Sequence, residues 1–162
     1  MADKIYRVNM TNLTTRIEDV PENWAGLGGR GLTSTIVAAE VIPTCHPLGP
    51  DNKLIFAPGL LSGTAAANSG RLSVGAKSPL TGTIKESNVG GTASQLFAKL
   101  GVKALIIEGQ AAKDSFYSLH VTSEGVEIAK EPNLGGKGNF AVVDTMLERL
   151  GEKTGVMTIG PA

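Results

Sequence analysis

The sequence has one cysteine, Cys45, no excess charge of either sign and no long apolar run. A single cysteine cannot form an internal disulfide, which fits a reducing compartment and predicts a cytoplasmic location. The 15 basic side chains balance the 15 acidic ones, so we expect no basic surface of the kind that binds nucleic acid. No apolar run approaches the roughly 18 residues that span a bilayer, and the first residues lack the pattern of a secretory signal. Nucleic acid and membrane are therefore not expected among the partners.

Side chains that usually perform catalysis are scarce as well. His46 stands beside Cys45 in a proline-flanked segment, and His120, the other histidine, lies on the polar face of an expected strand. A single adjacent Cys–His pair lacks the ligands of a metal site, and a loop thiol is a commoner role for such a cysteine than a nucleophile. The carboxylates are scattered along the chain. We therefore predict no catalytic residue in this sequence.

Glycine is abundant, with 21 residues in 162, about twice its average usage. Gly26, Gly28 and Gly31 spell G-x-G-x-x-G, which indicates a dinucleotide site only where it directly follows a buried strand. The residues before it, Pro-Glu-Asn-Trp at 21–24, are not such a strand, so a nucleotide-binding enzyme is a minor alternative. The segment 70–78 resembles a phosphate loop, but it carries one extra residue and is followed by a proline, which prevents the required helix.

The length suits one domain, residues 1–162. Hydrophobic periodicity and turn signals predict helices at 32–42, 92–100 and 140–150, and strands at 4–9, 16–20, 53–57, 71–76, 104–107, 116–122, 126–129 and 156–159. This mixture of strands, hairpins and helices favours an α+β fold. The chain stops just after its last expected strand, so we expect it to be part of a longer protein.

Two similar stretches occur about nineteen residues apart. L-S-G-T at 61–64 is followed by N-S-G at 68–70, and L-T-G-T at 80–83 is followed by N-V-G at 88–90. The echo predicts two related loops on one surface, with exposed backbone N–H groups of the kind that hold anions. Ordinary turn chemistry explains the same pattern, and both interpretations stay open here.

Arg71 is the strongest candidate for an anion-binding side chain. It directly follows the first N-x-G, and the second, Asn88-Val89-Gly90, leads through Gly91 into an expected helix. A guanidinium donates in bidentate fashion to phosphate, and a helix start adds partial positive charge. A phosphate-bearing cofactor is thus one hypothesis. The alternatives are a structural ion pair for Arg71, a turn role for Asn88, and a non-catalytic module that binds a phosphate ligand or a protein partner.

An ordered set of short motifs spans nearly the whole chain. They are Y-R-V-N-M-T at 6–11, G-G-R-G-L at 28–32, P-L-G-P-D-N at 47–52, L-S-G-T at 61–64, S-G-R at 69–71, K-S-P-L-T-G at 77–82, N-V-G-G at 88–91, I-I-E-G at 106–109 and I-G-P-A at 159–162. In this combination the sequence resembles the N-terminal domain of the tungsten-containing aldehyde ferredoxin oxidoreductase family.

The resemblance implies a single pterin-cradling domain, with mixed sheets that form a barrel-like base from two intertwined repeats. It implies a tungsten or molybdenum bis-pterin with magnesium, and a 4Fe–4S cluster bound by later domains. The implied reaction of the whole enzyme is oxidation of an aldehyde with water to a carboxylic acid, with electrons passing through the cluster to ferredoxin or another redox partner. A homo-oligomer is possible. Because the cluster ligands lie in later domains, the isolated chain is expected to hold no cofactor and to be inactive.

The resemblance also assigns cofactor-binding roles to five residues. Arg71 corresponds to an arginine between the pterin and the cluster. Asn88 corresponds to an asparagine whose backbone carbonyl binds the magnesium that bridges the pterin phosphates. Gly90 and Gly91 correspond to backbone contacts. Val89 is included with them, although it stands where the family has serine, so no hydroxyl contact is expected there.

Overall fold

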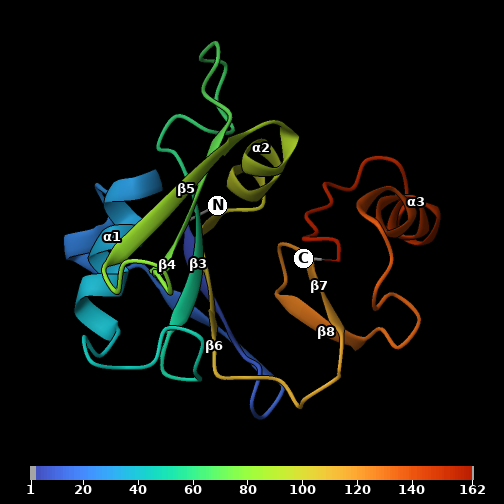
Figure 1. Cartoon of the computed structure of the whole chain (residues 1–162). Helices are drawn as coiled ribbons and strands as arrows, with labels where there is room; N and C mark the ends of the chain where they lie inside the picture. The colour runs from blue at the N-terminus through green and yellow to red at the C-terminus, as the bar shows by residue number, and fades with distance from the viewer. Residues whose placement is uncertain (1–2, 162) are drawn as a thin grey trace.

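The computed structural model describes residues 3–161, and Ala162, the last residue of the I-G-P-A motif, lies outside them. Six strands form one mixed sheet, two more form a separate hairpin, and helices cover the large sheet (Figure 1). In chain order the elements are β1 (Lys4–Asn9), β2 (Thr14–Asp19), a 3-10 helix (Glu22–Trp24), α1 (Gly29–Glu40), β3 (Lys53–Pro58), β4 (Arg71–Lys77), β5 (Ile84–Gly90), α2 (Thr92–Lys99), β6 (Val102–Glu108), β7 (Tyr117–Val121), β8 (Val126–Lys130) and α3 (Asn139–Leu150). Among the described residues no helix has the length and apolar character needed to cross a membrane.

The strand β6 lies inside the large sheet, whose order is β2-β1-β6-β3-β4-β5. It pairs in parallel with β1 and antiparallel with β3. Its first five residues are all buried, because helices or the hairpin cover both faces of this part of the sheet and select a nearly continuous apolar run. The more polar strands β2 and β5 take the two edges, where water can solvate their side chains.

The hydrophobic core is divided into two layers by the sheet. Helix α1 covers one face, where Leu32 and Ile36 pack with Ile55 and Ile106. Helix α2 and the β7–β8 hairpin cover the other face, where residues such as Phe97 pack with alternate side chains of β1 and β6 (Figure 1). Since successive strand residues point to opposite faces, β1 and β6 contribute to both layers.

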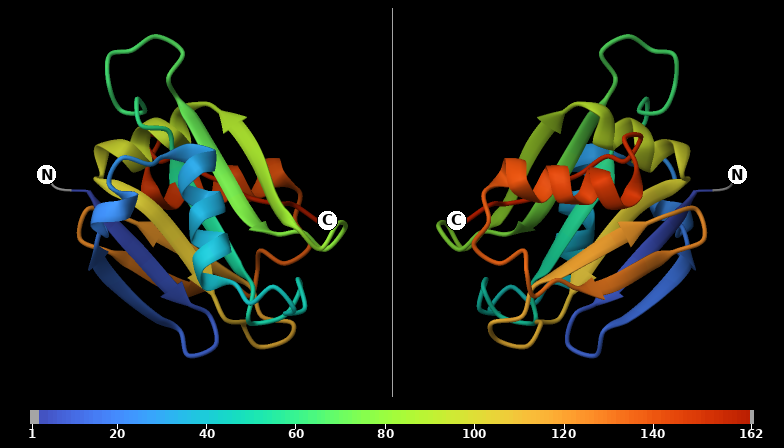
Figure 2. Two further views of the ribbon diagram at one scale, coloured as in Figure 1. Left: turned by 90° about the vertical axis from the view of Figure 1, so that its left-hand side faces the viewer. Right: turned by 90° about the vertical axis from the view of Figure 1, so that its right-hand side faces the viewer.

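Helix α3 lies beyond the β7–β8 hairpin, on the side of the sheet away from α1 (Figure 2). Its Arg149 forms an ion pair of 2.6 Å with Glu131, and Glu131 also accepts a hydrogen bond of 2.6 Å from Ser118 of β7. Met146 is the buried residue of this helix. These contacts attach α3 to the hairpin.

Most elements agree with the sequence prediction, and the α+β class is confirmed. Helix α1 begins earlier than predicted, at Gly29, since its glycines occupy the first turn. The region 58–91, predicted to hold little but β4, also contains β5. That strand is rich in polar residues because it is an exposed edge, and so it lacks the apolar signal of a buried strand. The strand predicted at 156–159 is wrong. This segment belongs to no strand, and the chain just before it packs against α2, where a Cβ on Gly155 would lie 2.8 Å from Leu96 Cδ1.

The predicted barrel-like base is also wrong. Within residues 3–161 the large sheet is open, with β2 and β5 as its edges. The prediction of two related loops on one surface fails for the L-[ST]-G-T copies, which lie at opposite ends of β4 (Figure 2). The seven residues of β4 separate the two L-[ST]-G-T segments by about 20 Å. The two N-x-G copies do come together, because β4 and β5 run antiparallel and Arg71 lies opposite Gly90.

Candidate functional site

Arg71 and Asn88 lie on the same face of the sheet, at the end where β4 begins and β5 ends. Arg71 is opposite Gly90, and Ser73 is opposite Asn88. Side chains two residues apart share a face, and Ser73 lies beneath the first turn of α1, since a Cβ on Gly29 would be 3.4 Å from its Oγ. A Cβ atom on Gly90 would likewise lie 3.5 Å from Arg71 Nη1, so the guanidinium lies over the Gly90 backbone. The structure thus brings Arg71, Asn88 and Gly90 together, and what they bind stays a prediction.

The other two predicted residues are arranged differently. Val89 alternates with its neighbours and pairs with Leu72, so its side chain points to the opposite face and only its backbone belongs to this surface. Gly91 is the N-cap of α2 with φ of +123°, a conformation that favours glycine, and no atom would lie within 4 Å of a Cβ there. The backbone at Gly91 is therefore open to approach.

The backbone of Arg71 is held firmly, whereas its side chain is exposed. Its carbonyl oxygen accepts hydrogen bonds from Gly59 N at 2.9 Å, from Ser94 Oγ at 2.7 Å and from Ser62 Oγ at 3.2 Å. Ser62 and Ser94 are buried and lie 2.7 Å apart, so they link the loop after β3, the start of β4 and α2. The guanidinium has no ion-pair partner in the part of the chain that the structure describes. The backbone of Arg71 is thus fixed, while its guanidinium has no ion-pair partner within residues 3–161.

A half-buried residue, Glu86, places its carboxylate one step further along the same face of β5. Its side chain is 9% exposed, and its Oε1 accepts hydrogen bonds from Ser73 Oγ at 2.7 Å and Asn88 Nδ2 at 3.4 Å. Its Oε2 pairs with Arg30 Nε at 3.3 Å. The hydrogen bond from Ser73 lowers the pKa of Glu86 most, with further lowering by Asn88 and by the charge of Arg30, against the effect of burial. The carboxylate is therefore ionised at neutral pH. Sequence reasoning missed this group because it missed β5.

The glycine-rich segment at 26–31 serves close packing and not a nucleotide turn. A Cβ on Gly28 would lie 2.9 Å from Leu60 N, which shows how closely the start of α1 approaches the loop after β3. On the facing strand, a Cβ on Gly75 would lie 2.5 Å from Thr33 Cβ. A 3-10 helix, and no strand, precedes the segment, so the dinucleotide alternative lacks its required strand–turn–helix context. The segment 70–78, which resembles a phosphate loop, is mostly the strand β4.

Comparison with known proteins decides the family. The family model described as aldehyde ferredoxin oxidoreductase, N-terminal domain, matches residues 5–162. The chain belongs to this family. It is 36% identical over 162 residues to the tungsten-containing aldehyde ferredoxin oxidoreductase of Pyrococcus furiosus, and 40% identical to that of Pyrococcus abyssi. Each alignment covers 98% of this chain but 26% of the relative, so the chain spans about a quarter of the length of these relatives.

A solved structure extends the family relationship to the fold. The active-site complex BamBC of benzoyl coenzyme A reductase, in complex with 1,5-dienoyl-CoA, contains a chain that matches with a TM-score of 0.86 and 28% identity. The match covers 93% of this chain and 23% of that one. The mixed sheet and its helices thus recur in a solved structure of a related chain.

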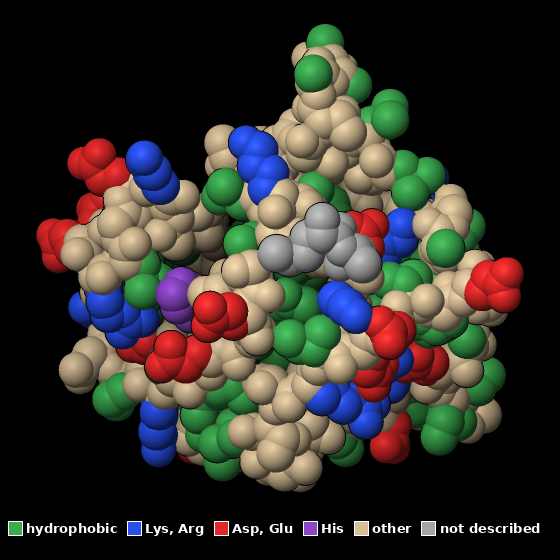
Figure 3. All heavy atoms as spheres, turned by 180° about the vertical axis from the view of Figure 1, so that it is seen from behind, with side chains coloured by type: hydrophobic (Ala, Val, Ile, Leu, Met, Phe, Trp, Pro, Cys, Tyr) green, Lys and Arg blue, Asp and Glu red, His purple; other side chains and the backbone are tan. Residues whose placement is uncertain are grey.

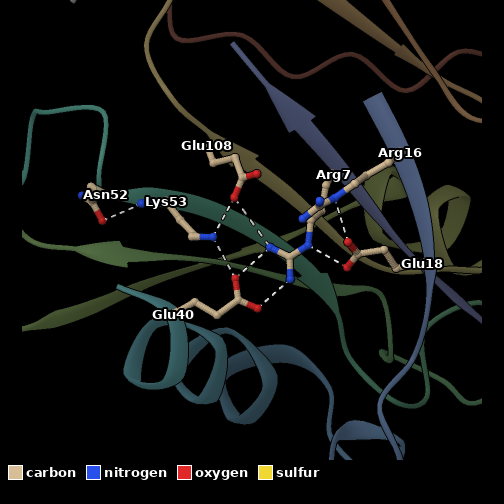
Figure 4. Close-up of polar contacts among 7 residues, drawn as sticks. All are labelled: Arg7, Arg16, Glu18, Glu40, Asn52, Lys53 and Glu108. Atoms are coloured by element: carbon tan, nitrogen blue, oxygen red, sulfur yellow. Dashed lines mark hydrogen bonds and ion pairs between the residues drawn. The ribbon is translucent and has the colours of Figure 1, made fainter. Parts of the chain in front are cut away.

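A second polar cluster lies under the other end of α1, around Arg7 (Figure 4). Arg7 is 7% exposed and forms ion pairs with Glu18 at 2.7 Å and Glu40 at 2.6 Å. Lys53 bridges Glu40 at 2.8 Å and Glu108 at 2.6 Å. The carboxylates that are scattered in the sequence therefore meet in space, on β2, α1 and β6.

The charges of the Arg7 cluster balance once Arg16 is included, since Arg16 pairs with Glu18 at 2.7 Å. Burial alone would raise the pKa of Glu40, but hydrogen bonds from Arg7 and Lys53 bring it down to about 2. The hydrogen bond to Glu40 likewise raises the pKa of Arg7. Both groups stay charged at neutral pH. Each cation and each carboxylate has a partner, so this cluster joins four strands and α1 and offers no reactive group.

No side-chain group among the described residues is placed to hold a metal ion, and the face drawn in Figure 3 shows no basic surface. Within residues 3–161 no group of three or more His, Cys, Asp or Glu side chains is placed to hold a metal ion. Cys45 lies in the loop after α1 and packs against the core, as a loop thiol would. On the face drawn in Figure 3, basic and acidic side chains are interspersed and form no continuous basic patch. This agrees with the balanced composition.

Proposed function

We propose that this chain is the cofactor-binding domain of an oxidoreductase that acts on aldehydes, and that the face around Arg71, Asn88, Gly90 and Gly91 binds the phosphate-bearing part of a pterin cofactor. The family membership supports the enzyme class. The observation that carries the site is the free guanidinium of Arg71, which lies over Gly90 and next to the Ser73–Asn88 pair.

The residues present fit the anionic part of such a cofactor. A phosphate requires cationic donors and backbone that it can approach closely. Arg71 provides the cation, and Gly90 and Gly91 leave the backbone uncovered. Leu60 and Leu61, both exposed, stand in the loop that donates to Arg71. Apolar side chains at this end favour a ligand with an organic ring system over a bare phosphate ion, which is the alternative for a non-catalytic module.

The chain fits the metals of the cofactor much less completely. Asn88 offers a backbone carbonyl for magnesium, since its side-chain amide already donates to Ser73 at 3.2 Å and to Glu86. Further ligands would have to come from the cofactor and from other parts of the protein. An iron–sulfur cluster needs several thiolates, and Cys45, in the loop after α1, supplies one thiol.

A tungsten or molybdenum bis-pterin, when bound, would supply the two-electron chemistry that converts an aldehyde and water to a carboxylic acid, with a 4Fe–4S cluster passing electrons to ferredoxin or another redox partner. The part of this chain is to hold and orient the phosphates, because redox chemistry belongs to the cofactor. We assign no catalytic residue to it. The chain alone should be inactive, and a homo-oligomer is compatible with this role.

Calorimetric titration of the chain with pyrophosphate and magnesium tests the proposed site. Pyrophosphate stands in for the linked phosphates of the cofactor. We expect saturable binding that Arg71→Gln weakens about tenfold, the effect of losing charge-assisted hydrogen bonds. The matched control is Arg16→Gln, which removes an exposed arginine from the opposite edge strand and should leave binding unchanged. Equal weakening by both variants would show a nonspecific charge effect and would contradict the proposal.

A further inference from the structure

Arg30 is held in an unusual way for an exposed arginine. Its side chain is 75% exposed, yet its Nε pairs with Glu86, whose side chain is 9% exposed. Burying a carboxylate is unfavourable unless it is well supplied with donors. Ser73 and Asn88 are two of these donors. A simple surface ion pair between mobile side chains has little net value, whereas here the carboxylate is fixed before Arg30 reaches it.

Among the described residues, the contact with Glu86 uses only Nε of Arg30 and leaves the two terminal nitrogens of its guanidinium available to bind a ligand. Neither terminal nitrogen of Arg30 has a hydrogen-bonding partner among residues 3–161. Those two nitrogens form part of the planar fork that matches two phosphate oxygens. With Nε fixed, the guanidinium loses much of its rotational freedom, so less entropy is lost when it binds an anion.

Arg30 and Arg71 lie at the two ends of one row of β5 residues. Glu86, Asn88 and Gly90 are alternate residues of β5 and follow one another along the same face, about 7 Å apart. Arg30 reaches the Glu86 end of this row from α1, and Arg71 covers the Gly90 end from β4. Asn88 lies between them. Two cations from different elements therefore flank Asn88, and the carboxylate of Glu86 lies at the Arg30 end of the row.

We propose that Arg30 is a second arginine of the anion site, that with Arg71 it binds a pair of phosphate groups across Asn88, and that Glu86 is the positioning residue for Arg30. This inference rests on the proposed function, because it extends the same face. It assigns the G-G-R-G segment a binding role in addition to its packing role. It also predicts a preference for a diphosphate over a single phosphate, since the two arginines lie at opposite ends of the row from Glu86 to Gly90.

The test is calorimetric titration of the 162-residue chain with pyrophosphate and, separately, with inorganic phosphate. Arg30→Gln should weaken pyrophosphate binding about tenfold and should reduce the preference over phosphate. Arg30→Lys retains the charge but lacks the fork, so it should restore only part of the affinity. Arg16→Gln is the matched control and should change neither value. Because Arg30 is exposed, none of these changes should alter the thermal unfolding temperature by more than a few degrees.

Glu86→Gln separates positioning from simple electrostatics. Removing a negative charge near an anion site would tighten binding if charge alone mattered. If Glu86 orients Arg30, the variant should instead weaken pyrophosphate binding about threefold, and it should have no effect in an Arg30→Gln background. Tighter binding by Glu86→Gln, or unchanged binding by Arg30→Gln while Arg71→Gln is defective, would overturn this inference and leave the Arg71 site standing. Absence of saturable binding by the unmodified chain would overturn both proposals.

Discussion

The guanidinium of Arg71 and the backbone of Gly90 face each other across β4 and β5, so that a Cβ at position 90 would lie 3.5 Å from Nη1. This distance is ordinary van der Waals contact, and φ at Gly90 is not positive. The absence of a side chain at position 90 is therefore not needed for the fold of β5. It leaves space beside the guanidinium for something else.

Substitution of Gly90 tests whether this space is used. Gly90→Val would fill it with a branched side chain that suits an edge strand. We expect the thermal unfolding temperature to stay the same or to rise, while pyrophosphate affinity falls about tenfold because the ligand and the side chain compete for one volume. A matched change at Ser87, an exposed residue of β5, to Val should affect neither quantity. Retained affinity in Gly90→Val would show that the ligand lies elsewhere.

The start of α1 offers a test of the packing role of the glycine-rich segment. Gly28→Ala places a Cβ 2.9 Å from the backbone nitrogen of Leu60, which cannot yield as a flexible side chain can. We expect a loss of about 1–3 kcal/mol in the free energy of unfolding, measured by urea denaturation. Gly26→Ala is the control, since nothing lies within 4 Å of its Cβ position. Equal stability of the two variants would contradict the close packing.

Glu40 should be important for stability. Glu40→Gln leaves Arg7, which is 7% exposed, without its shortest ion pair, and breaking a buried pair costs roughly 3–5 kcal/mol. Urea denaturation should show this loss, with little change in the urea dependence of the free energy. Asp19→Asn provides the contrast, because Asp19 pairs with Lys4 at the surface and its loss should have no measurable effect. A small effect of Glu40→Gln on the free energy of unfolding would contradict this prediction and would mean that water solvates the charge of Arg7 in the variant.

The low pKa of Glu40 should also make the free energy of unfolding depend on pH. The pKa of Glu40 is about 2 in the folded chain, against 4.5 for a free glutamate. Its stabilising contribution is therefore complete above about pH 4.5 and is lost as pH falls toward 2, because the unfolded chain takes up the proton first. Glu86 and Glu131, whose pKa values are also lowered, act in the same direction. The free energy of unfolding, measured in urea from pH 6 to pH 2.5, should fall less steeply for Glu40→Gln. Identical slopes would contradict the account.

The parts of the fold that could be predicted are those whose neighbours impose a strong local pattern. β6 is apolar because both faces are covered, and α2 ends at Lys99, two residues before Gly101, whose φ is +75°. β5 was missed because an edge strand has no such requirement. The cluster of Arg7, Glu40 and Glu108 could not be predicted, since only the pairing of β1 with β6 and the docking of α1 bring the three together.

For the candidate site, the sequence predicted the meeting of Arg71 with Asn88 through two similar N-x-G segments. It did not predict that Arg30 and Glu86 form an ion pair at this site. These two residues are 56 positions apart and meet only because α1 packs across β4 and β5. The signal that was available is the alternation of Glu86, Asn88 and Gly90, which becomes informative once β5 is recognised as a strand.

The most direct test of the cofactor-binding face is to locate the bound ligand. Pyrophosphate and magnesium can be titrated into the isotope-labelled chain while backbone amide chemical shifts are followed by NMR. We expect the largest changes at Arg71, Asn88, Gly90 and Gly91, and no change around Arg7 at the other end of α1. Changes that centre on the Arg7 cluster, or that are spread over the lysines of the surface, would contradict the assignment of this face.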